Sequence, residues 1–167
     1  MATRAYVDPS LPSSCARAAT AAEARYRIQR PIAPARAPRI IALDDRAVEV
    51  VRRAATLDWT NARFYACEPG DGAVTLRGIE GRRPATLADE LASADVVVMI
   101  ATDDAGADSA DTIGKACWQR SIMTAGLVVS DDDAADRAVA ALRPHARVLL
   151  PGADESDVIE LLTALRA

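Results

Sequence analysis

Aromatic residues and histidine are scarce in this sequence, and neither sign of charge dominates. Phe, Trp and Tyr together make up 4% of the 167 residues, which argues against the stacked aromatic surfaces that bind single-stranded nucleic acid. The formal net charge of −4 is too small to indicate a polyanionic partner or a membrane surface. We therefore expect no nucleic acid and no membrane among the partners of this protein.

Cysteine is also rare, and its spacing matches neither a metal site nor a disulfide framework. The three cysteines, Cys15, Cys67 and Cys117, are odd in number and lie far apart in the chain. The first residues contain no continuous apolar segment of the kind that directs secretion. The expected location is a reducing cytoplasm.

The clearest pattern in the chain lies in residues 95–130. An unbroken apolar run at 96–101 is followed by an acidic loop, a helical pattern and a second apolar run at 127–129. Strands that are apolar at consecutive positions are typical of parallel sheets with helices on both faces. This region therefore predicts a strand, helix and strand at the centre of an α/β domain.

Strand and helix patterns alternate through the rest of residues 39–167. Further strands are predicted at residues 39–43, 63–67 and 147–150, with a hairpin strand at 73–77 on an edge of the sheet. Further helices are predicted after Asp44 or Asp45, after Thr86, from Asp131-Asp132-Asp133 to Pro144, and after Asp154. Such alternation predicts a Rossmann-like three-layer sandwich with a mostly parallel sheet and right-handed crossovers.

A short helix is expected to lead into the central strand. Thr86 and Asp89 have the spacing of a capping box, in which each side chain satisfies a backbone N–H group of the first turn. Leu87, Ala88 and Leu91 then mark the side of this helix that is predicted to be buried.

Residues 1–38 differ in composition from the rest of the chain. They are rich in Ala, Pro, Ser and Arg, with six arginines against two acidic residues, and so form a basic arm on an acidic body. A loosely packed tail has this composition. The arm can also lie on the acidic body of a second copy of the chain, which would make the protein a homo-oligomer, and both interpretations stay open.

The loops that follow the predicted strands are rich in carboxylates. In open parallel sheets, ligands bind at the carboxyl ends of the strands, near the point where the strand order reverses. The residues expected to line a small-ligand site there are Asp44, Glu68, Thr102, Asp103, Asp104, Gly106 and Ser130. Glu68 ends its strand about where a Rossmann fold places the carboxylate that binds a ribose.

A glycine-rich phosphate loop is absent. In dinucleotide-binding folds, glycines after the first strand let the backbone and the next helix N-terminus hold a pyrophosphate. Here that turn has no glycine, and Asp44 and Asp45 would occupy the anion site themselves. The P-loop pattern with its lysine is also missing. Classical NAD(P) or GTP binding is therefore not expected.

The strand at residues 94–101, ADVVVMIA, and the later strand at 124–129, TAGLVV, flank a loop and a helix. This layout resembles the nucleotide-binding half of the bacterial tubulin-like cell-division GTPases, the FtsZ family. Where that family has its glycine-rich loop on the GTP phosphates, this chain has residues 103–109, DDAGADS, and it is too short for the family's second domain. The resemblance implies a shared Rossmann-like architecture over residues 39–130, without GTP hydrolysis or filament assembly.

The aspartates after the central strand allow another interpretation. Asp103, Asp104 and Asp108, with Asp44 or Asp131 from neighbouring strand ends, can coordinate Mg²⁺ or another divalent cation, or bind a cationic small molecule. Aspartate is also a preferred residue at helix starts, where it serves only as a cap. The sequence leaves both roles open.

Covalent and acid–base catalysis have little support. His145 is the only histidine and is expected to be a surface residue at the amino end of the last strand. Cys67 and Cys117 are expected to be small core residues. Two functions remain: a non-catalytic module that binds a small ligand in the manner of nucleotide-binding domains, or a metal-dependent enzyme that uses the carboxylate cluster.

Overall fold

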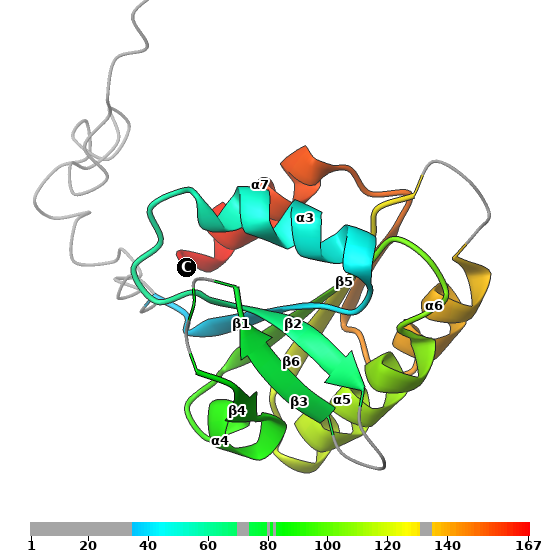
Figure 1. Ribbon diagram of the computed structural model, residues 1–167, viewed down its shortest axis with the longest axis horizontal. Coiled ribbons are helices and arrows are strands. Elements are labelled where there is room, and N and C mark those ends of the chain that lie inside the picture. Colours follow the sequence, from blue (N-terminus) through cyan, green and yellow to red (C-terminus); the bar gives the residue numbers. More distant parts are fainter. Residues whose placement is uncertain (1–34, 70–73, 80, 82, 131–134) are drawn as a thin grey trace, which may run out of the picture. The chain divides into compact units, whose positions relative to one another are not determined.

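The computed structural model describes residues 35–69, 74–79, 81, 83–130 and 135–167. They form an α/β domain with a seven-stranded, mostly parallel sheet between two layers of helices (Figure 1), which confirms the predicted fold class. Among these residues, no helix has the length and apolar character needed to cross a membrane. Most of the predicted arm, residues 1–38, lies outside the described residues. Its role in a homo-oligomer therefore stays a prediction.

The elements follow the predicted alternation with one additional strand. In chain order they are β1 (Pro38–Ala42), α3 (Asp45–Ala55), β2 (Arg63–Pro69), β3 (Val74–Gly78), β4 (Ala85–Thr86), α4 (Leu87–Leu91), β5 (Val96–Ala101), α5 (Ala107–Gln119), β6 (Met123–Val128), α6 (Asp136–Leu142), β7 (Val148–Pro151) and α7 (Glu155–Leu165). The predicted opening of α6 at Asp131-Asp132-Asp133 lies outside the described residues.

The strand order fixes where a ligand site is expected. The order is β4-β3-β2-β1-β5-β6-β7, with β2, β1, β5, β6 and β7 parallel and β3 and β4 antiparallel to their neighbours. The chain moves from β1 to β2 on one side and later returns to place β5 on the other side of β1. The order therefore reverses between β1 and β5, and the crevice for a ligand belongs at the carboxyl ends of these strands.

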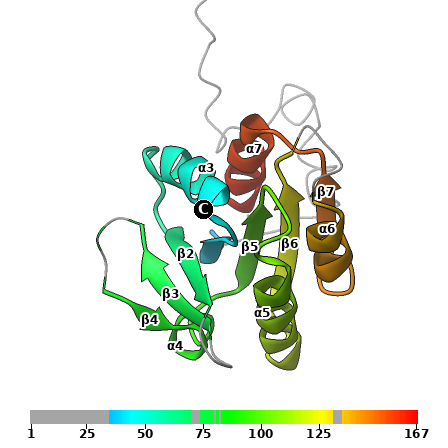
Figure 2. The same cartoon turned by 45° about the vertical axis from the view of Figure 1, so that its right-hand side comes forward.

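Two apolar cores lie on the two faces of the sheet. Alternate residues of β1 point to opposite faces, so Ile40 packs in one core and Ile41 in the other. Helices α3 and α7 cover the first core, and α4, α5 and α6 cover the second, as Figure 2 shows. All six residues of β5 are buried because this strand has helices on both faces. That burial explains why its sequence is apolar at consecutive positions.

The short helix α4 differs in detail from its prediction. The two residues of β4 pair outside β3, so β3 is not the edge strand that the sequence suggested. The Thr86 hydroxyl accepts from the N–H of Asp89 but donates to its carboxylate, so the reciprocal half of a capping box is missing. Ala88 is exposed and not buried, because a helix of five residues turns only Leu87 and Leu91 toward the sheet.

His145 is more enclosed than the surface position that the sequence suggested. Its side chain is 11% exposed, and its Nε2 atom lies 3.0 Å from Oδ1 of Asp111. The imidazole packs directly on Gly114 of α5, where an added Cβ would lie 2.2 Å from Cγ of His145. The missing side chain at Gly114 is what lets the ring approach the helix.

Candidate functional site

Asp44 joins the carboxyl ends of β1 and β5. It is 8% exposed, and its Oδ1 accepts from the N–H of Ala47 at 2.7 Å and from the Thr102 hydroxyl at 2.6 Å. Oδ2 accepts from the N–H of Thr102 at 2.7 Å and from the N–H of Asp103 at 3.4 Å. The carboxylate therefore caps α3 and also holds the start of the loop that follows β5.

Gly106 brings the same loop against the end of β1. A Cβ at this position would lie 2.5 Å from both the Cβ and the carbonyl oxygen of Leu43. Because one of these atoms belongs to the backbone, a larger residue cannot be accommodated by a side-chain rotation alone. Gly106 thus has a packing role beside the predicted site.

We expect Gly106→Ala to lower the free energy of unfolding by about 2 kcal/mol, because overpacking typically costs 1 to 3 kcal/mol. Urea denaturation followed by circular dichroism measures the change. Gly81→Ala is the comparison: its added Cβ meets no atom within 4 Å, but its φ of +73° gives a cost of about 1 kcal/mol. A Gly106→Ala protein no less stable than Gly81→Ala would contradict the packing role.

The aspartates after β5 serve local structure. Oδ1 of Asp103 accepts from the N–H of Ala105 at 2.8 Å, and Oδ1 of Asp104 accepts from the N–H of Ala138 at 2.9 Å, in the first turn of α6. The Asp108 side chain is 98% exposed and lies 3.5 Å from Arg137. Within the described ranges, no group of three or more Asp, Glu, His or Cys residues is placed to hold a metal ion. A metal site that also uses Asp131 stays a prediction, since that residue is not described.

Glu68 lies near the end of β2, on the hairpin of β2 and β3. It is exposed, and its Oε1 accepts from Nε of Arg77 at 2.7 Å. This cross-strand ion pair is a sufficient structural role for the carboxylate. Whether Glu68 also contacts a ribose stays a prediction.

A cleft of about 470 Å³ lies on the α3 and α7 side of the carboxyl edge. Figure 2 shows these two helices side by side on one face of the sheet. The cleft is lined by Arg46, Glu49, Val50, Arg53, Thr102, Val129, Ser130, Ala153, Asp154 and Glu155. Two of the predicted ligand residues, Thr102 and Ser130, are therefore in its wall, whereas Asp44 lies directly behind Thr102.

Most charged groups of the cleft already have partners. Arg53 donates from Nε to Oε2 of Glu155 at 2.8 Å and from its terminal nitrogen to Oε1. This hydrogen bonding lowers the pKa of Glu155 and raises that of Arg53. Asp154 caps α7, and hydrogen bonds from the hydroxyl of Ser156 and from two backbone N–H groups lower its pKa. The guanidinium of Arg46 forms no hydrogen bond or ion pair with any residue that the structure describes.

The sequence interpretation missed the contribution of α3. Arg46, Glu49, Val50 and Arg53 follow the spacing i, i+3, i+4 and i+7, which places them on one face of a helix. Three of these residues are polar, and they lie on the helix that follows the first strand. This pattern in the sequence could have indicated a site at the carboxyl edge.

The two described cysteines are poor candidates for a nucleophile. Burial raises the pKa of the Cys67 thiol, and burial raises the pKa of the Cys117 thiol to about 12. Both thiols are therefore protonated at neutral pH, and the protonated form is the less reactive one. His145 lies at the amino end of β7, away from the cleft, and cannot activate a group there.

Comparisons with known proteins leave the family of this chain open. No protein-family model matches the chain, and no curated protein matches it significantly. Among solved structures, it is similar to proximal thread matrix protein 1 (PTMP1) from the mussel byssus, at 9% sequence identity and a TM-score of 0.44. The match covers 77% of this chain and 44% of the PTMP1 chain.

Proposed function

We propose that this protein is a non-catalytic, Rossmann-like module that binds a small polar molecule in the cleft between α3 and α7. The observation that supports the proposal is the cleft itself, with the guanidinium of Arg46 unpaired among the described residues. The cleft lies at the carboxyl edge of the sheet, between the helix that follows β1 and the ends of β5 and β6, and so borders the point between β1 and β5 where the strand order reverses and where such sheets bind ligands. Its volume lies within the range of small-molecule sites.

The charges of the cleft favour a ligand with a single anionic group. Arg46 offers a fork of N–H donors that suits a carboxylate. Two arginines and three acidic residues line the cleft, so the summed formal charge is −1. A nucleoside triphosphate would bring several negative charges to this wall, where no glycine-rich loop is available to hold them. A monocarboxylate, or a zwitterion whose ammonium group contacts the acidic residues, fits better.

A metal-dependent enzyme is the alternative that the carboxylates after β5 suggested, and no specific contact favours it over binding alone.

The expected compartment is a reducing cytoplasm, since Cys67 and Cys117 are both free thiols. Neither the binding module nor the metal-dependent enzyme requires assembly through the basic arm.

A thermal-shift screen of the full-length protein tests the proposal. The compounds are aliphatic monocarboxylates, aliphatic amino acids and related zwitterions, nucleotides, NAD(P), Mg²⁺ and Mn²⁺. A ligand at a hundred times its dissociation constant stabilises the folded state by about 2.7 kcal/mol, which raises the melting temperature by several degrees. We expect such a shift with a monocarboxylate or a zwitterion.

Substitution of Arg46 assigns the shift to the cleft. We expect Arg46→Gln to abolish it and Arg143→Gln, a change at the exposed C-cap residue of α6, to leave it intact. A shift that survives Arg46→Gln, or the absence of any shift, contradicts the proposed site. A shift with Mg²⁺ or Mn²⁺ alone that is lost when Asp103 and Asp104 become Asn supports the metal-dependent enzyme instead.

A further inference from the structure

Trp118 on α5 is an unusually exposed aromatic residue. Its relative exposure is 81%, against 45% for Leu57 and Val148, the next most exposed of the large apolar side chains in the described ranges. Tryptophan is a large apolar group that most proteins cover, and exposed tryptophans are enriched where a ligand or partner binds. The exposure of this side chain therefore makes it a candidate contact for a ligand or a partner.

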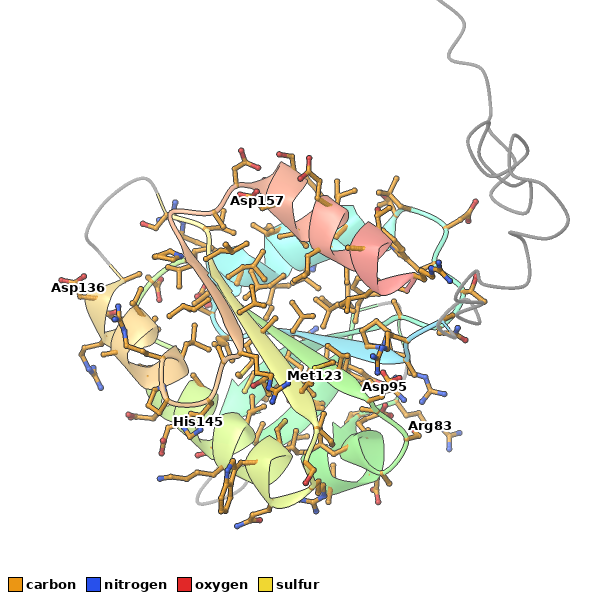
Figure 3. The ribbon with its side chains drawn as sticks, turned by 180° about the vertical axis from the view of Figure 1, so that it is seen from behind. Arg83, Asp95, Met123, Asp136, His145 and Asp157 are labelled. Atoms are coloured by element: carbon orange, nitrogen blue, oxygen red, sulfur yellow. The ribbon has the colours of Figure 1, made fainter. Side chains whose placement is uncertain are left out.

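A groove lies beside Trp118 at the amino edge of the sheet. It has a volume of about 470 Å³ and lies where α5 ends and where β6 and β7 begin. Half-buried Ile122 and Met123 give it apolar surface, and His145 forms part of its wall. Figure 3 shows Met123 and His145 on the face of the domain formed by β6, α5 and the segment that leads into β7.

The charge of this groove is opposite to that of the cleft at the carboxyl edge. None of the described residues that line it is acidic, and Arg147 supplies its one permanent charge. The Arg147 side chain has no hydrogen bond or ion pair with a described residue. The nearby carboxylate of Asp111 is already bound by Lys115 at 2.6 Å and by His145 at 3.0 Å. An anionic ligand in this groove would therefore find one cation, Arg147, that has no partner among the described residues. It would find no unpaired carboxylate to repel it.

We propose that this groove is a second binding site, specific for a planar aromatic anion such as an aromatic carboxylate. The ring stacks on the indole of Trp118, and the carboxylate pairs with the guanidinium of Arg147. Stacking between aromatic rings contributes about 0.5 to 1.5 kcal/mol beyond the buried area, and a charge-assisted hydrogen bond adds direction. This site lies at the opposite edge of the sheet from the cleft of Arg46, so the two proposals stand or fall separately.

NMR titration of the ¹⁵N-labelled full-length protein with 2-naphthoate tests this site. The chain contains two tryptophans, so the spectrum has two indole N–H signals, which the Trp59→Phe variant assigns. The indole N–H of Trp59 donates to the carbonyl of Ala54 at 2.9 Å, which makes its signal an internal reference. We expect the Trp118 signal to move saturably with 2-naphthoate and the Trp59 signal to stay in place.

Matched probes and variants separate the ring from the charge. We expect 2-naphthamide, which has the same ring without the charge, and cyclohexanecarboxylate, which has the charge without the ring, to bind at least about tenfold more weakly. Arg147→Gln should weaken 2-naphthoate binding by about tenfold, while Arg83→Gln, at an exposed arginine elsewhere, should not change it.

Four outcomes overturn the proposal. They are an unmoved Trp118 signal, binding of either matched probe as tight as that of naphthoate, unchanged binding in Arg147→Gln, and a Trp118 signal that moves with protein concentration alone. The last would assign this face to contact with a second copy of the chain. Because the groove and the cleft share no lining residue, failure here does not bear on the cleft.

Discussion

Replacing Asp44 with alanine is expected to lower the free energy of unfolding by at least about 3 kcal/mol. Loss of a helix cap alone typically costs about 1 kcal/mol. The substitution also leaves the N–H and the hydroxyl of Thr102 without their acceptor, and Thr102 is 5% exposed. Each buried donor left without a partner costs about 1 to 3 kcal/mol. The sum is a large fraction of the 5 to 15 kcal/mol that stabilises a typical domain.

Asp154→Ala is the matched control for this prediction. Asp154 also caps a helix, through bonds to the N–H groups of Ser156 and Asp157, but it is exposed and joins no second strand. Its loss should cost only about 1 kcal/mol. Urea denaturation of the two variants gives the comparison, and similar losses would show that Asp44 is no more than a cap.

Asp44→Asn refines the test. An amide has one acceptor oxygen, so it can serve either the α3 cap or the backbone of Thr102, but not both. We expect this variant to fall between the original protein and Asp44→Ala. Asparagine at an ordinary exposed cap would cost almost nothing, because it is as good a cap as aspartate.

The secondary structure was predictable because its signals are local. Six consecutive apolar residues at 96–101 predicted a strand buried on both faces, and β5 is buried in this way. Helix starts were predicted at Asp44 or Asp45 and at Asp154 because a cap acts within its own helix, and the structure shows Asp44 and Asp154 as the caps. The strand β4 was missed because two residues carry no periodicity. Its pairing depends on Thr75 and Leu76 of β3, which the sequence does not place beside it.

The candidate site was less predictable because its contacts join distant residues. The bond of Asp104 to the N–H of Ala138 spans 34 positions and that of Asp44 to Thr102 spans 58. No pattern in a single sequence states which carboxylate meets which donor across such intervals. That the acidic loops lie at the carboxyl edge could be predicted, because it follows from the fold class. The roles of the individual aspartates could not, because they depend on the geometry of each loop.

Arg39 is the clearest case of a residue whose environment the sequence concealed. It was expected only as the first residue of a strand, but it is 2% exposed. Its Nε donates to Oε2 of Glu90 at 2.9 Å and its terminal nitrogen donates to the Ser93 hydroxyl at 2.7 Å. Arg63 reaches the same oxygen of Glu90 at 3.3 Å. Glu90 is therefore the carboxylate that permits a guanidinium to be buried beside the sheet.

The pKa of Glu90 reflects this environment. Burial by itself raises the pKa, but hydrogen bonds from Tyr65 and Arg39 and the charges of Arg39 and Arg63 outweigh it, so the pKa lies below its usual value. A carboxyl group whose pKa is lower in the folded state stabilises that state when it is ionised. This contribution is present above about pH 4.3, the ordinary pKa of glutamate, and is lost as the pH falls through the folded value.

We therefore expect Glu90→Gln to lower the free energy of unfolding at pH 7 by about 3 kcal/mol, the lower end of the range for removing one partner of a buried ion pair. The bond of Arg39 to Ser93 remains and keeps the cost at that end. Glu49→Gln, which removes the exposed partner of Arg52, should cost less than about 0.5 kcal/mol.

Denaturation curves between pH 7 and about pH 2 supply the second readout for Glu90→Gln. The protonated carboxyl group of Glu90 resembles the amide, so the stabilities of the original protein and the variant should converge in acid. A Glu90→Gln deficit that stays constant over this range would mean that packing, and not the charge of Glu90, supports the buried arginine.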